Sequence, residues 1–377
     1  MRIGFDGKRA VQNFTGLGNY SRYIIDILYR FSPGNEYVLY APRKRSSRNF
    51  DELLQRCPLL KTIYPEGSWK RFKSLWRTFG LTSRLEDDGI DIFHGLSNEL
   101  PLNIRKAKNV KSVVTIHDLI FLRYPAYYHW IDRKIYTYKF RKACENADVV
   151  IAISECTKRD IISYFHIPEE KIKVVYQGCD ASFTQVVTSE KKQEVREKYD
   201  LPEHYILNVG SIEERKNVLL AVKALPHLPQ EMHLVIVGRR TPYTDEVETF
   251  IRIHHLEDRV KILSGVPFID LPAIYQQAEI FVYPSRFEGF GIPIIEAIHS
   301  GLPVVAATGS CLEESGGPDS IYVHPDDVEA MVAALKRITC DESLRQNMLE
   351  QGKKYVCRFS EEKQVQQLVC IYNNKWC

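Results

Sequence analysis

Short runs of β-branched and aromatic residues recur along this chain of 377 residues, and helical patterns separate most of them. Strands that alternate with helices build a parallel sheet, because each parallel connection needs a crossover segment. The alternation occurs in residues 1–176 and again in residues 205–323, so the sequence predicts two α/β domains, each with a parallel sheet. The expected strands are Arg2–Phe5, Tyr37–Tyr40, Ile90–His94, Ser112–Ile116, Val149–Ile153, Lys173–Tyr176, Tyr205–Val209, His233–Val237, Val260–Leu263, Phe281–Tyr283, Val304–Ala306 and Ile321–Val323.

The length of the chain also suits two domains. We place the boundary at residue 180, ahead of the polar, lysine-rich segment Val186–Asp200, which is expected to open the second domain. A last helix is expected after Ser360, which is a suitable N-cap. Its apolar stripe needs a surface to pack on and consists of Val365, Leu368, Val369 and Tyr372.

Composition and charge narrow the class of protein. No apolar run is long enough to span a bilayer, and Met1-Arg2 leads directly into a strand rather than a signal peptide. Nine scattered cysteines, with no Cys-x-x-Cys, predict a cytoplasmic protein without structural zinc. Residues 1–176 hold 30 basic and 19 acidic residues, an excess of eleven positive charges, whereas the remainder holds 21 and 29. A basic first half predicts an anionic partner, such as a membrane surface or a phosphorylated substrate; a merely solvated basic face is the alternative.

One stretch, residues 284–297, combines a glycine-rich turn with two carboxylates. Glu288 lies on the turn, at the start of a helix expected to begin near Ile292, and Glu296 lies within that helix. Glycines let backbone N–H groups approach a ligand, and a helix N-terminus favours negative charge. Glu296 has apolar neighbours and is costly to bury unless it accepts hydrogen bonds, which ligand hydroxyls could donate. A ligand site is therefore favoured over a helix whose charges face water.

Two further loops are placed to contact phosphate. Gly16 and Gly18 are expected after the first strand, at the start of a helix, where a phosphate contact and a plain tight turn both remain open. Ser21 replaces the third glycine of the dinucleotide fingerprint, which argues against an NAD-dependent dehydrogenase. In the second half, Arg215 and Lys216 follow a Val-Gly-Ser turn and open a helix. Cations are unfavourable at a helix N-terminus, so their presence favours a bound diphosphate over solvated charge.

Two histidines and two aromatic segments leave alternatives open. His94 and His117 end strands at the edge where α/β sheets bind ligands, and a ligand role is favoured for His117 more than for His94.

Residues 69–79 place four aromatics on one helical face among basic residues, which predicts either a membrane-surface helix or one packed on the core. A similar basic and aromatic stretch, residues 124–142, suggests nucleic-acid binding as another function, but the α/β pattern of the chain disfavours it. The aromatic face of the first segment is Trp69, Phe72, Trp76 and Phe79, interleaved with Lys70, Arg71, Lys73 and Arg77.

These motifs resemble the retaining glycosyltransferases of family 4, also called glycosyl transferases group 1, over nearly the whole chain. The most specific element is the Glu288–Glu296 pair inside Pro-Ser-x-Phe-Glu-Gly-Phe-Gly. The resemblance implies a GT-B fold, with two Rossmann-like domains (1–180 and 181–357) facing each other across a cleft and a C-terminal helix, in 358–377, crossing back to the first. Supporting motifs are Gly16-x-Gly18, Ile116-His117-Asp118, Val209-Gly210 with Arg215-Lys216, and Asp258-Arg259-Val260.

The resemblance also implies roles for individual residues. Glu288 would contact donor-sugar hydroxyls, Glu296 would hold the nucleotide ribose, and His117 would lie beside the sugar on the acceptor side. Many members carry arginine where this chain has Ser211, so Arg215 is expected to bear more of the diphosphate charge. The implied catalytic residues are His117, Glu288, Lys216 and Arg215. The implied donor-binding residues are Gly16, Gly18, Gly210, Ser211, Arg215, Lys216, Val266, Glu288, Gly289, Phe290, Gly291, Ile292 and Glu296.

The implied activity is transfer of a hexose, with retention, from a nucleoside-diphosphate sugar to a saccharide in surface polysaccharide synthesis. No metal or other cofactor is expected, because no Asp-x-Asp occurs. The sequence of residues 210–217 resembles the mannosyltransferase branch of the family, which implies GDP-mannose as the donor. UDP-sugars are the alternative donors. The acceptor is expected to be lipid-linked, with peripheral contact to an anionic membrane at its inner face and no nucleic acid partner. A non-catalytic nucleotide-sugar-binding protein is the alternative class.

Overall fold

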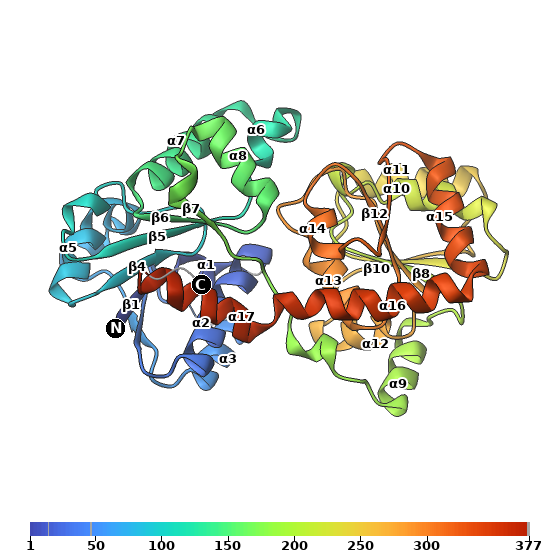
Figure 1. The fold of residues 1–377 in the computed structure, drawn as a ribbon, viewed down its shortest axis with the longest axis horizontal. Coiled ribbons are helices and arrows are strands. Elements are labelled where there is room, and N and C mark those ends of the chain that lie inside the picture. The colour runs from blue at the N-terminus through green and yellow to red at the C-terminus, as the bar shows by residue number, and fades with distance from the viewer. Residues whose placement is uncertain (14, 46, 375–377) are drawn as a thin grey trace. The chain divides into compact units, whose positions relative to one another are not determined.

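The computed structural model describes residues 1–13, 15–45 and 47–374 (Figure 1). The chain forms two compact units. Unit 1 comprises Met1–Tyr176 and the segment that begins at Glu361, and unit 2 comprises Gln177–Ser360. The boundaries expected at residues 180 and 357 lie a few residues away from these. Two parallel-sheet α/β units confirm the fold class expected from the alternation of strands and helices.

Unit 1 is built on seven parallel strands in the order β3-β2-β1-β4-β5-β6-β7. The six expected strands are present, with bounds shifted by a residue or two. One strand, β3, was not predicted, because it has three partly exposed residues at the sheet edge and no apolar face. The strands are β1 Arg2–Asp6, β2 Glu36–Tyr40, β3 Lys61–Ile63, β4 Ile92–Gly95, β5 Lys111–Ile116, β6 Val149–Ala152 and β7 Ile172–Val174.

Unit 2 is built on six parallel strands in the order β10-β9-β8-β11-β12-β13, and all six were predicted. In each unit the strand order reverses once, between β1 and β4 and between β8 and β11. The loops that follow the two strands at such a reversal run in opposite directions and leave a crevice where α/β proteins bind ligands. The strands are β8 Tyr205–Val209, β9 His233–Val237, β10 Val260–Leu263, β11 Ile280–Tyr283, β12 Val304–Ala307 and β13 Ile321–Val323.

Helices cover both faces of each sheet (Figure 1). In unit 1, α2, α3 and α17 pack on one face and α5, α7 and α8 on the other. The helices of unit 1 are α1 Lys8–Gln12, α2 Gly16–Phe31, α3 Arg48–Arg56, α4 Lys73–Leu75, α5 Leu81–Asp87, α6 Ile120–Arg123, α7 Trp130–Asn146, α8 Glu155–Phe165 and α17 Glu361–Tyr372. Those of unit 2 are α9 Ser189–Tyr199, α10 Leu219–Ala224, α11 Tyr243–Ile253, α12 Leu271–Tyr275, α13 Ile292–His299, α14 Leu312–Gly316, α15 Val328–Cys340 and α16 Glu342–Val356.

The C-terminal helix α17 belongs to unit 1, where its apolar stripe packs on α2 and the sheet. Leu368 is fully buried there, and the hydroxyl of Tyr372 lies 2.7 Å from Nδ1 of His94. Nε2 of the same ring lies 2.8 Å from the hydroxyl of Thr115. Complete burial, with a smaller effect of His117, lowers the pKa of His94 to about 3. His94 is therefore a neutral core residue that ties the last helix to strands β4 and β5.

Residues 67–80 do not form the single basic amphipathic helix that the periodicity predicts. The chain forms a 3-10 turn (η1, Gly67–Lys70), then α4, and then a π-helical turn over Trp76–Gly80 (η2). Gly80 gives the room for this fold, because a Cβ there would lie 2.8 Å from the Trp69 ring. Trp76 alone enters the core; Trp69, Phe72 and Phe79 are more than one-third exposed.

Arg77 is likewise not a surface cation of that helix. Its guanidinium is largely buried and forms ion pairs with Asp6, at the end of β1, and with Glu99, in the loop after β4. The Arg77–Glu99 distance is 2.6 Å. Burial opposes the charge of Arg77, but the two carboxylates outweigh it and raise its pKa. Arg77 thus joins the two strands at the order reversal of unit 1.

We predict that Tyr372→Phe lowers the stability of unit 1 by about 1–3 kcal/mol, because a buried nitrogen of His94 loses its partner. Leu368→Ala should cost about 2–5 kcal/mol through the cavity that it leaves. Urea unfolding followed by tryptophan fluorescence would measure both, since the tryptophans of the described residues lie in unit 1. The exposed Tyr138→Phe is the control. An unfolding midpoint for Tyr372→Phe equal to that of the control would contradict the role of the His94 contact.

Candidate functional site

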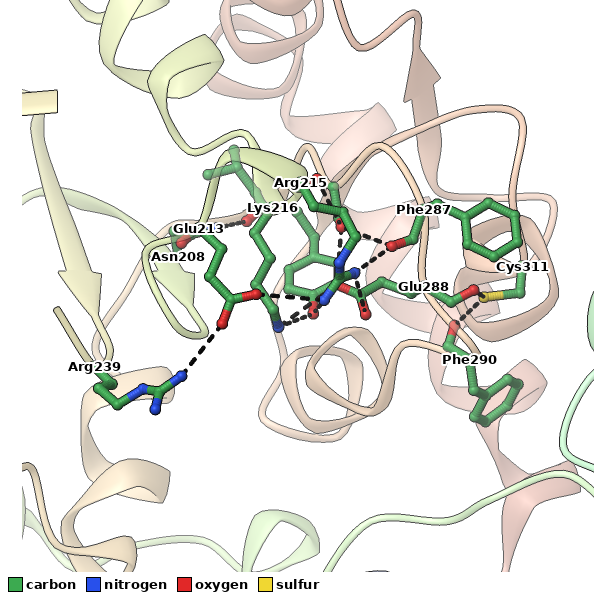
Figure 2. A network of polar contacts seen from close by, with 12 residues as sticks. Asn208, Glu213, Arg215, Lys216, Arg239, Phe287, Glu288, Phe290 and Cys311 are labelled. Carbon is green, nitrogen blue, oxygen red and sulfur yellow. Dashed lines mark hydrogen bonds and ion pairs between the residues drawn. The ribbon is translucent and has the colours of Figure 1, made fainter. Parts of the chain in front are cut away.

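In unit 2 two loops meet where the strand order reverses. One follows β8 and contains the 3-10 turn η7 (Glu214–Lys216); the other follows β11 and leads to α13. The backbone N–H of Arg286 donates to the carbonyl of Arg215 at 2.8 Å. The amide of Asn217 donates to the carbonyls of Pro284 (3.2 Å) and Pro325 (2.7 Å). The loops are thereby fixed to each other, and their charged side chains meet (Figure 2).

Glu288 forms ion pairs with both cations of the first loop. Its carboxylate lies 2.9 Å from Nη1 of Arg215 and 3.5 Å from Nζ of Lys216. The three side chains are 13–18% exposed, so their charges interact with little screening by water. Burial alone would raise the pKa of Glu288, but Lys216 and Arg215 outweigh it and lower that pKa to about 2. In turn Glu288 raises the pKa of both cations against the effect of their burial. All three groups are ionised at neutral pH.

Tyr283, the last residue of β11, contacts this network from the end of the strand. Its hydroxyl lies 3.1 Å from Nζ of Lys216 and 3.2 Å from Oε1 of Glu288. The hydroxyl of Ser285 donates to the same carboxylate oxygen at 2.8 Å. Tyr283 is 3% exposed, so its ring is fixed in the sheet. The sequence predicts Tyr283 only as a strand residue, because its site role depends on a loop 67 residues away.

The network carries excess positive charge. Besides Glu288 it contains Glu213, which lies 3.7 Å from Arg215 and 3.5 Å from the exposed Arg239. Three cations, counting Lys216, thus face two carboxylates, which leaves one positive charge in excess. Arg239 is 73% exposed, but among the three least exposed groups, Arg215, Lys216 and Glu288, two cations also face one carboxylate. This largely buried excess favours an anion in contact with Arg215 and Lys216.

Two glycines allow close backbone packing around Lys216. A Cβ at Gly210 would lie 3.0 Å from Nζ of Lys216, and Ser211 follows in the same turn. Gly238, directly after β9, is more strictly required, because a Cβ there would lie 1.8 Å from the carbonyl oxygen of Gly210. Gly238 was not among the predicted site residues. Its position after a strand was the available signal, but the approach of Gly210 comes from the pairing of β8 with β9.

The turn of residues 288–291 leads into α13, which begins at Ile292 as predicted. Gly291 has φ +119°, and a Cβ there would lie 2.7 Å from the hydroxyl of Ser315, so a side chain is excluded twice. Sγ of the buried Cys311 lies 3.0 Å from the carbonyl oxygens of Glu288 and Phe290. This fixes the backbone on both sides of Gly289 (Figure 2).

Glu296, in the middle of α13, is in a different electrostatic environment. The hydroxyl of Tyr275 donates to its Oε2 at 2.9 Å. Burial is the main cause that raises the pKa of Glu296 to about 7, with Asp180 adding to it and Tyr275 and Lys216 opposing it. The two carboxylates of the motif thus differ: Glu288 stays ionised, and Glu296 titrates near neutral pH.

The remaining predicted donor-binding residue of unit 2 is Val266. It lies in the loop after β10, next to Gly265, whose φ is +71°. Val266 is partly exposed. Among the described residues no hydrogen bond or ion pair joins it to the network of Arg215, Lys216 and Glu288, and its place among the donor-binding residues stays a prediction.

Gly16, Gly18 and His117 lie in unit 1. The glycine loop does not follow β1 directly, because the unpredicted helix α1 stands between them. Phe14, part of the predicted loop, lies outside the described residues. A Cβ at Gly18 would lie 1.9 Å from the carbonyl oxygen of Asn13, so a tight turn alone explains this glycine. Gly16 is exposed with open space around it. Their phosphate contact stays a prediction.

His117 follows β5, as predicted, and is buried. Nε2–H donates to the carbonyl of Leu96 at 2.9 Å, and the backbone N–H donates to Asn98 at 2.8 Å. The imidazole packs edge to face with the ring of Tyr20, with centroids 4.5 Å apart. Burial lowers the pKa of His117 to about 4, although the Leu96 contact opposes this. At neutral pH His117 is therefore uncharged, and a contact with a sugar stays a prediction.

The described residues show neither a metal-binding cluster nor a membrane-spanning helix. Residues 1–13, 15–45 and 47–374 contain no group of three or more His, Cys, Asp or Glu side chains placed to hold a metal ion. Within the same ranges no helix is both long and apolar enough to cross a bilayer.

Comparison with known proteins gives the family. Residues 16–183 match the model of Glycosyltransferase Family 4, and residues 189–355 match that of Glycosyl transferases group 1. The O-antigen chain mannosyltransferase B of Escherichia coli is 31% identical over 287 residues, 74% of each chain. The O-antigen chain mannosyltransferase RfbU of Salmonella typhimurium is 30% identical over 226 residues, 60% of each chain. The protein belongs to this family of glycosyltransferases, as the motifs predicted.

Solved structures agree with the fold. The sucrose-phosphate synthase of Thermosynechococcus elongatus superposes with a TM-score of 0.78, at 20% identity, over 99% of this chain and 98% of its own. Anabaena HepE in complex with UDP gives a TM-score of 0.79 at 18% identity, over 99% of this chain and all of its own. The GT-B fold class predicted from the sequence is confirmed.

We predict that Glu288→Gln binds a free nucleoside diphosphate at least about fivefold more tightly than the unaltered protein, because the local excess charge rises from one to two. Titration calorimetry with GDP and with UDP would measure this. Glu257→Gln, an exposed change of equal charge elsewhere in unit 2, is the control. Weaker diphosphate binding by Glu288→Gln, in a variant with an unchanged melting temperature, would contradict competition between Glu288 and the anion.

Proposed function

We propose that the protein is a retaining glycosyltransferase that moves a hexose, mannose in preference, from a nucleoside-diphosphate sugar to a saccharide acceptor. The acceptor is carried on a lipid at the cytoplasmic face of a membrane, in the synthesis of a surface polysaccharide. The observation that carries this proposal is the network of Arg215, Lys216 and Glu288, with its surplus positive charge at the strand-order reversal of unit 2. The family supplies the transfer reaction, and the network supplies a site for its leaving group.

The leaving diphosphate gains negative charge as the glycosidic bond breaks. Lys216 and Arg215 are already charged, and Tyr283 and Glu288 hold them in place. Preorganised cations of this kind stabilise a transition state without being reorganised when the bond breaks. The N–H groups of Phe290, Gly291 and Ile292, at the start of α13, add oriented dipoles. This assignment gives no role to a metal ion, so transfer is expected to continue in EDTA.

Glu288 suits the binding of sugar hydroxyls better than nucleophilic attack. Two cations lower its pKa to about 2, and a carboxylate so stabilised is a weak nucleophile. Glu296 is partly protonated near neutral pH and is likewise poorly suited to form a covalent intermediate. We therefore favour substitution on the face from which the diphosphate leaves, rather than a double displacement.

The names of the relatives support mannose as the transferred sugar. Two are O-antigen mannosyltransferases, at 31% and 30% identity, which favours GDP-mannose as the donor. HepE, whose structure contains UDP, is 18% identical, so a UDP-sugar is the alternative. A thermal-shift screen of nucleotide-sugars would choose between them, because a ligand that binds only the folded protein raises its melting temperature. Calorimetric binding of the donor without turnover, across many acceptors, would favour the non-catalytic alternative.

With the donor identified, Lys216→Ala should lower kcat/KM by about 30- to 1,000-fold, equivalent to roughly 2–4 kcal/mol of transition-state stabilisation. Glu288→Ala should also lose most activity, because the sugar loses a hydrogen-bond acceptor and the cations lose their partner. Lys336→Ala, an exposed change in unit 2, is the control for both. If Lys216→Ala and Glu288→Ala both kept the kcat/KM of the control, the assignment of the site would be wrong.

The raised pKa of Glu296 predicts a pH dependence of donor binding. The ionised carboxylate accepts hydrogen bonds from ribose hydroxyls, whereas the protonated carboxyl must first lose its proton. Because that pKa is about 7, donor KM should rise by up to about tenfold for each pH unit below 7 and level off above pH 8. Steady-state kinetics from pH 5.5 to 8.5 would show this. Glu296→Gln should remove the dependence; an unchanged profile in this variant would exclude Glu296 as its source.

A further inference from the structure

Unit 1 exposes an unusual share of the large apolar side chains of the protein. Sixteen such side chains are exposed among the residues that the structure describes, and nine of them come from residues 69–79 and 130–138. A contiguous apolar surface on a folded protein marks an interaction site more often than single exposed residues do. We call these nine the aromatic face: Trp69, Phe72, Leu75, Phe79, Trp130, Ile131, Ile135, Tyr136 and Tyr138.

The two segments lie side by side although they are distant in sequence. A cavity of about 310 Å³ lies between them, lined by Arg77 and Thr78 from the first and by Ile135 and Tyr138 from α7. A second cavity, of about 390 Å³, lies on the other side of α7, with Trp130 and Tyr138 in its wall. The N-terminal part of α7 thus stands between two hollows. α7 lies on the side of the sheet opposite α17 (Figure 1).

The exposed stripe of α7 combines apolar and cationic side chains. Trp130, Lys134 and Tyr138 are four residues apart and share one side of the helix, and Ile131 and Ile135 lie next to them. All five are exposed, whereas Ala143 and Cys144, near the end of the helix, are buried in the core. The ammonium of Lys134 lies 5.0 Å from the centre of the Trp130 ring.

Cations surround the aromatic face, and few acids neutralise them. Residues 130–142 contain five basic residues and one acid, Asp132. Lys142 pairs with Glu145 at 2.6 Å and Lys139 with Glu99 at 3.6 Å, which leaves the side around Arg133 and Lys134 positive. Nε of Arg133, in the wall of the larger cavity, is buried without a hydrogen-bond partner among the described residues. Three more cations, Lys70, Arg71 and Lys73, lie in the first segment.

From these contacts we infer that the aromatic face binds the surface of an anionic phospholipid bilayer, with α7 lying in the plane of the interface. The rings and the aliphatic side chains enter the boundary of the acyl chains, and the cations meet the lipid phosphates. Ile131, Ile135 and Leu75 favour this partner over a nucleic acid, because isoleucine and leucine offer no ring on which bases stack. The inference rests on the proposed function only in that a lipid-linked acceptor would lie at the same interface.

Co-sedimentation of the full chain with vesicles tests the inference. We expect binding to vesicles of phosphatidylglycerol and phosphatidylcholine at low salt, and at least about fivefold weaker binding at 0.5 M NaCl, where screening is strong. Trp130→Ser with Ile135→Ser should weaken binding at least about fivefold, while Ile253→Ser with Ile269→Ser, two more exposed side chains in unit 2, should not. Lys134→Glu should weaken it about tenfold or more, and Lys336→Glu should weaken it far less.

The inference fails if the chain does not sediment with anionic vesicles at low salt. It also fails if both serine pairs bind the vesicles equally well, which would indicate attraction by charge alone. It fails likewise if Trp130→Ser with Ile135→Ser lowers binding to a single-stranded oligonucleotide and not to vesicles. Transfer to a water-soluble acceptor is measured in parallel. Loss of transfer in Lys216→Ala with vesicle binding intact supports both proposals. Vesicle binding by a chain that transfers no sugar would overturn the proposed function and leave the membrane contact standing.

Discussion

The arrangement of unit 2 depends on the ion pairs that Glu288 makes with Arg215 and Lys216. Two cations in a largely buried loop would repel each other and lose hydration, and one carboxylate from the loop after β11 compensates for both effects. That carboxylate reaches them because the strand order reverses between β8 and β11, which brings the two loops together. Gly210 and Gly238 permit the close approach, and Tyr283 fixes its geometry. The same contacts that stabilise the loops therefore prepare a site for an anion.

The two glutamates of one short motif show how position decides charge. Glu288 lies on a turn within reach of two cations, so its pKa falls to about 2. Glu296 lies further along the chain, within α13, where burial dominates and a tyrosine hydroxyl donates a single hydrogen bond, so its pKa rises to about 7. A group that stays ionised is a constant acceptor for sugar hydroxyls, whereas one that titrates near neutrality makes ribose binding depend on pH. Residue type and spacing alone would have assigned both the same charge.

Features that depend on neighbours in sequence could be predicted, and features that depend on tertiary contacts could not. The strand runs, the start of α13 and the residues Arg215, Lys216, Glu288 and Glu296 all lie in short motifs with local rules. Gly238, Tyr283 and Cys311 were missed, because each has a partner at least twenty residues away in the sequence. The helix expected over residues 69–79 was wrong for a related reason: Trp69 folds onto Gly80, and Arg77 is drawn inward by Asp6 and Glu99. The spacing of apolar residues along the sequence carries no information about such contacts between separate segments.

The division of charge along the chain separates two kinds of anion recognition. The half that holds Arg215 and Lys216 has eight more acidic than basic residues, so its net charge would not attract a diphosphate from a distance. Phosphate recognition there comes from two fixed cations at contact range, where low exposure makes each of them effective. The half that contains the aromatic face has eleven more basic than acidic residues and acts over longer distances, within the limit set by salt. Opposite net charges on the two halves would turn unit 1 rather than unit 2 towards an anionic surface, before any apolar side chain makes contact.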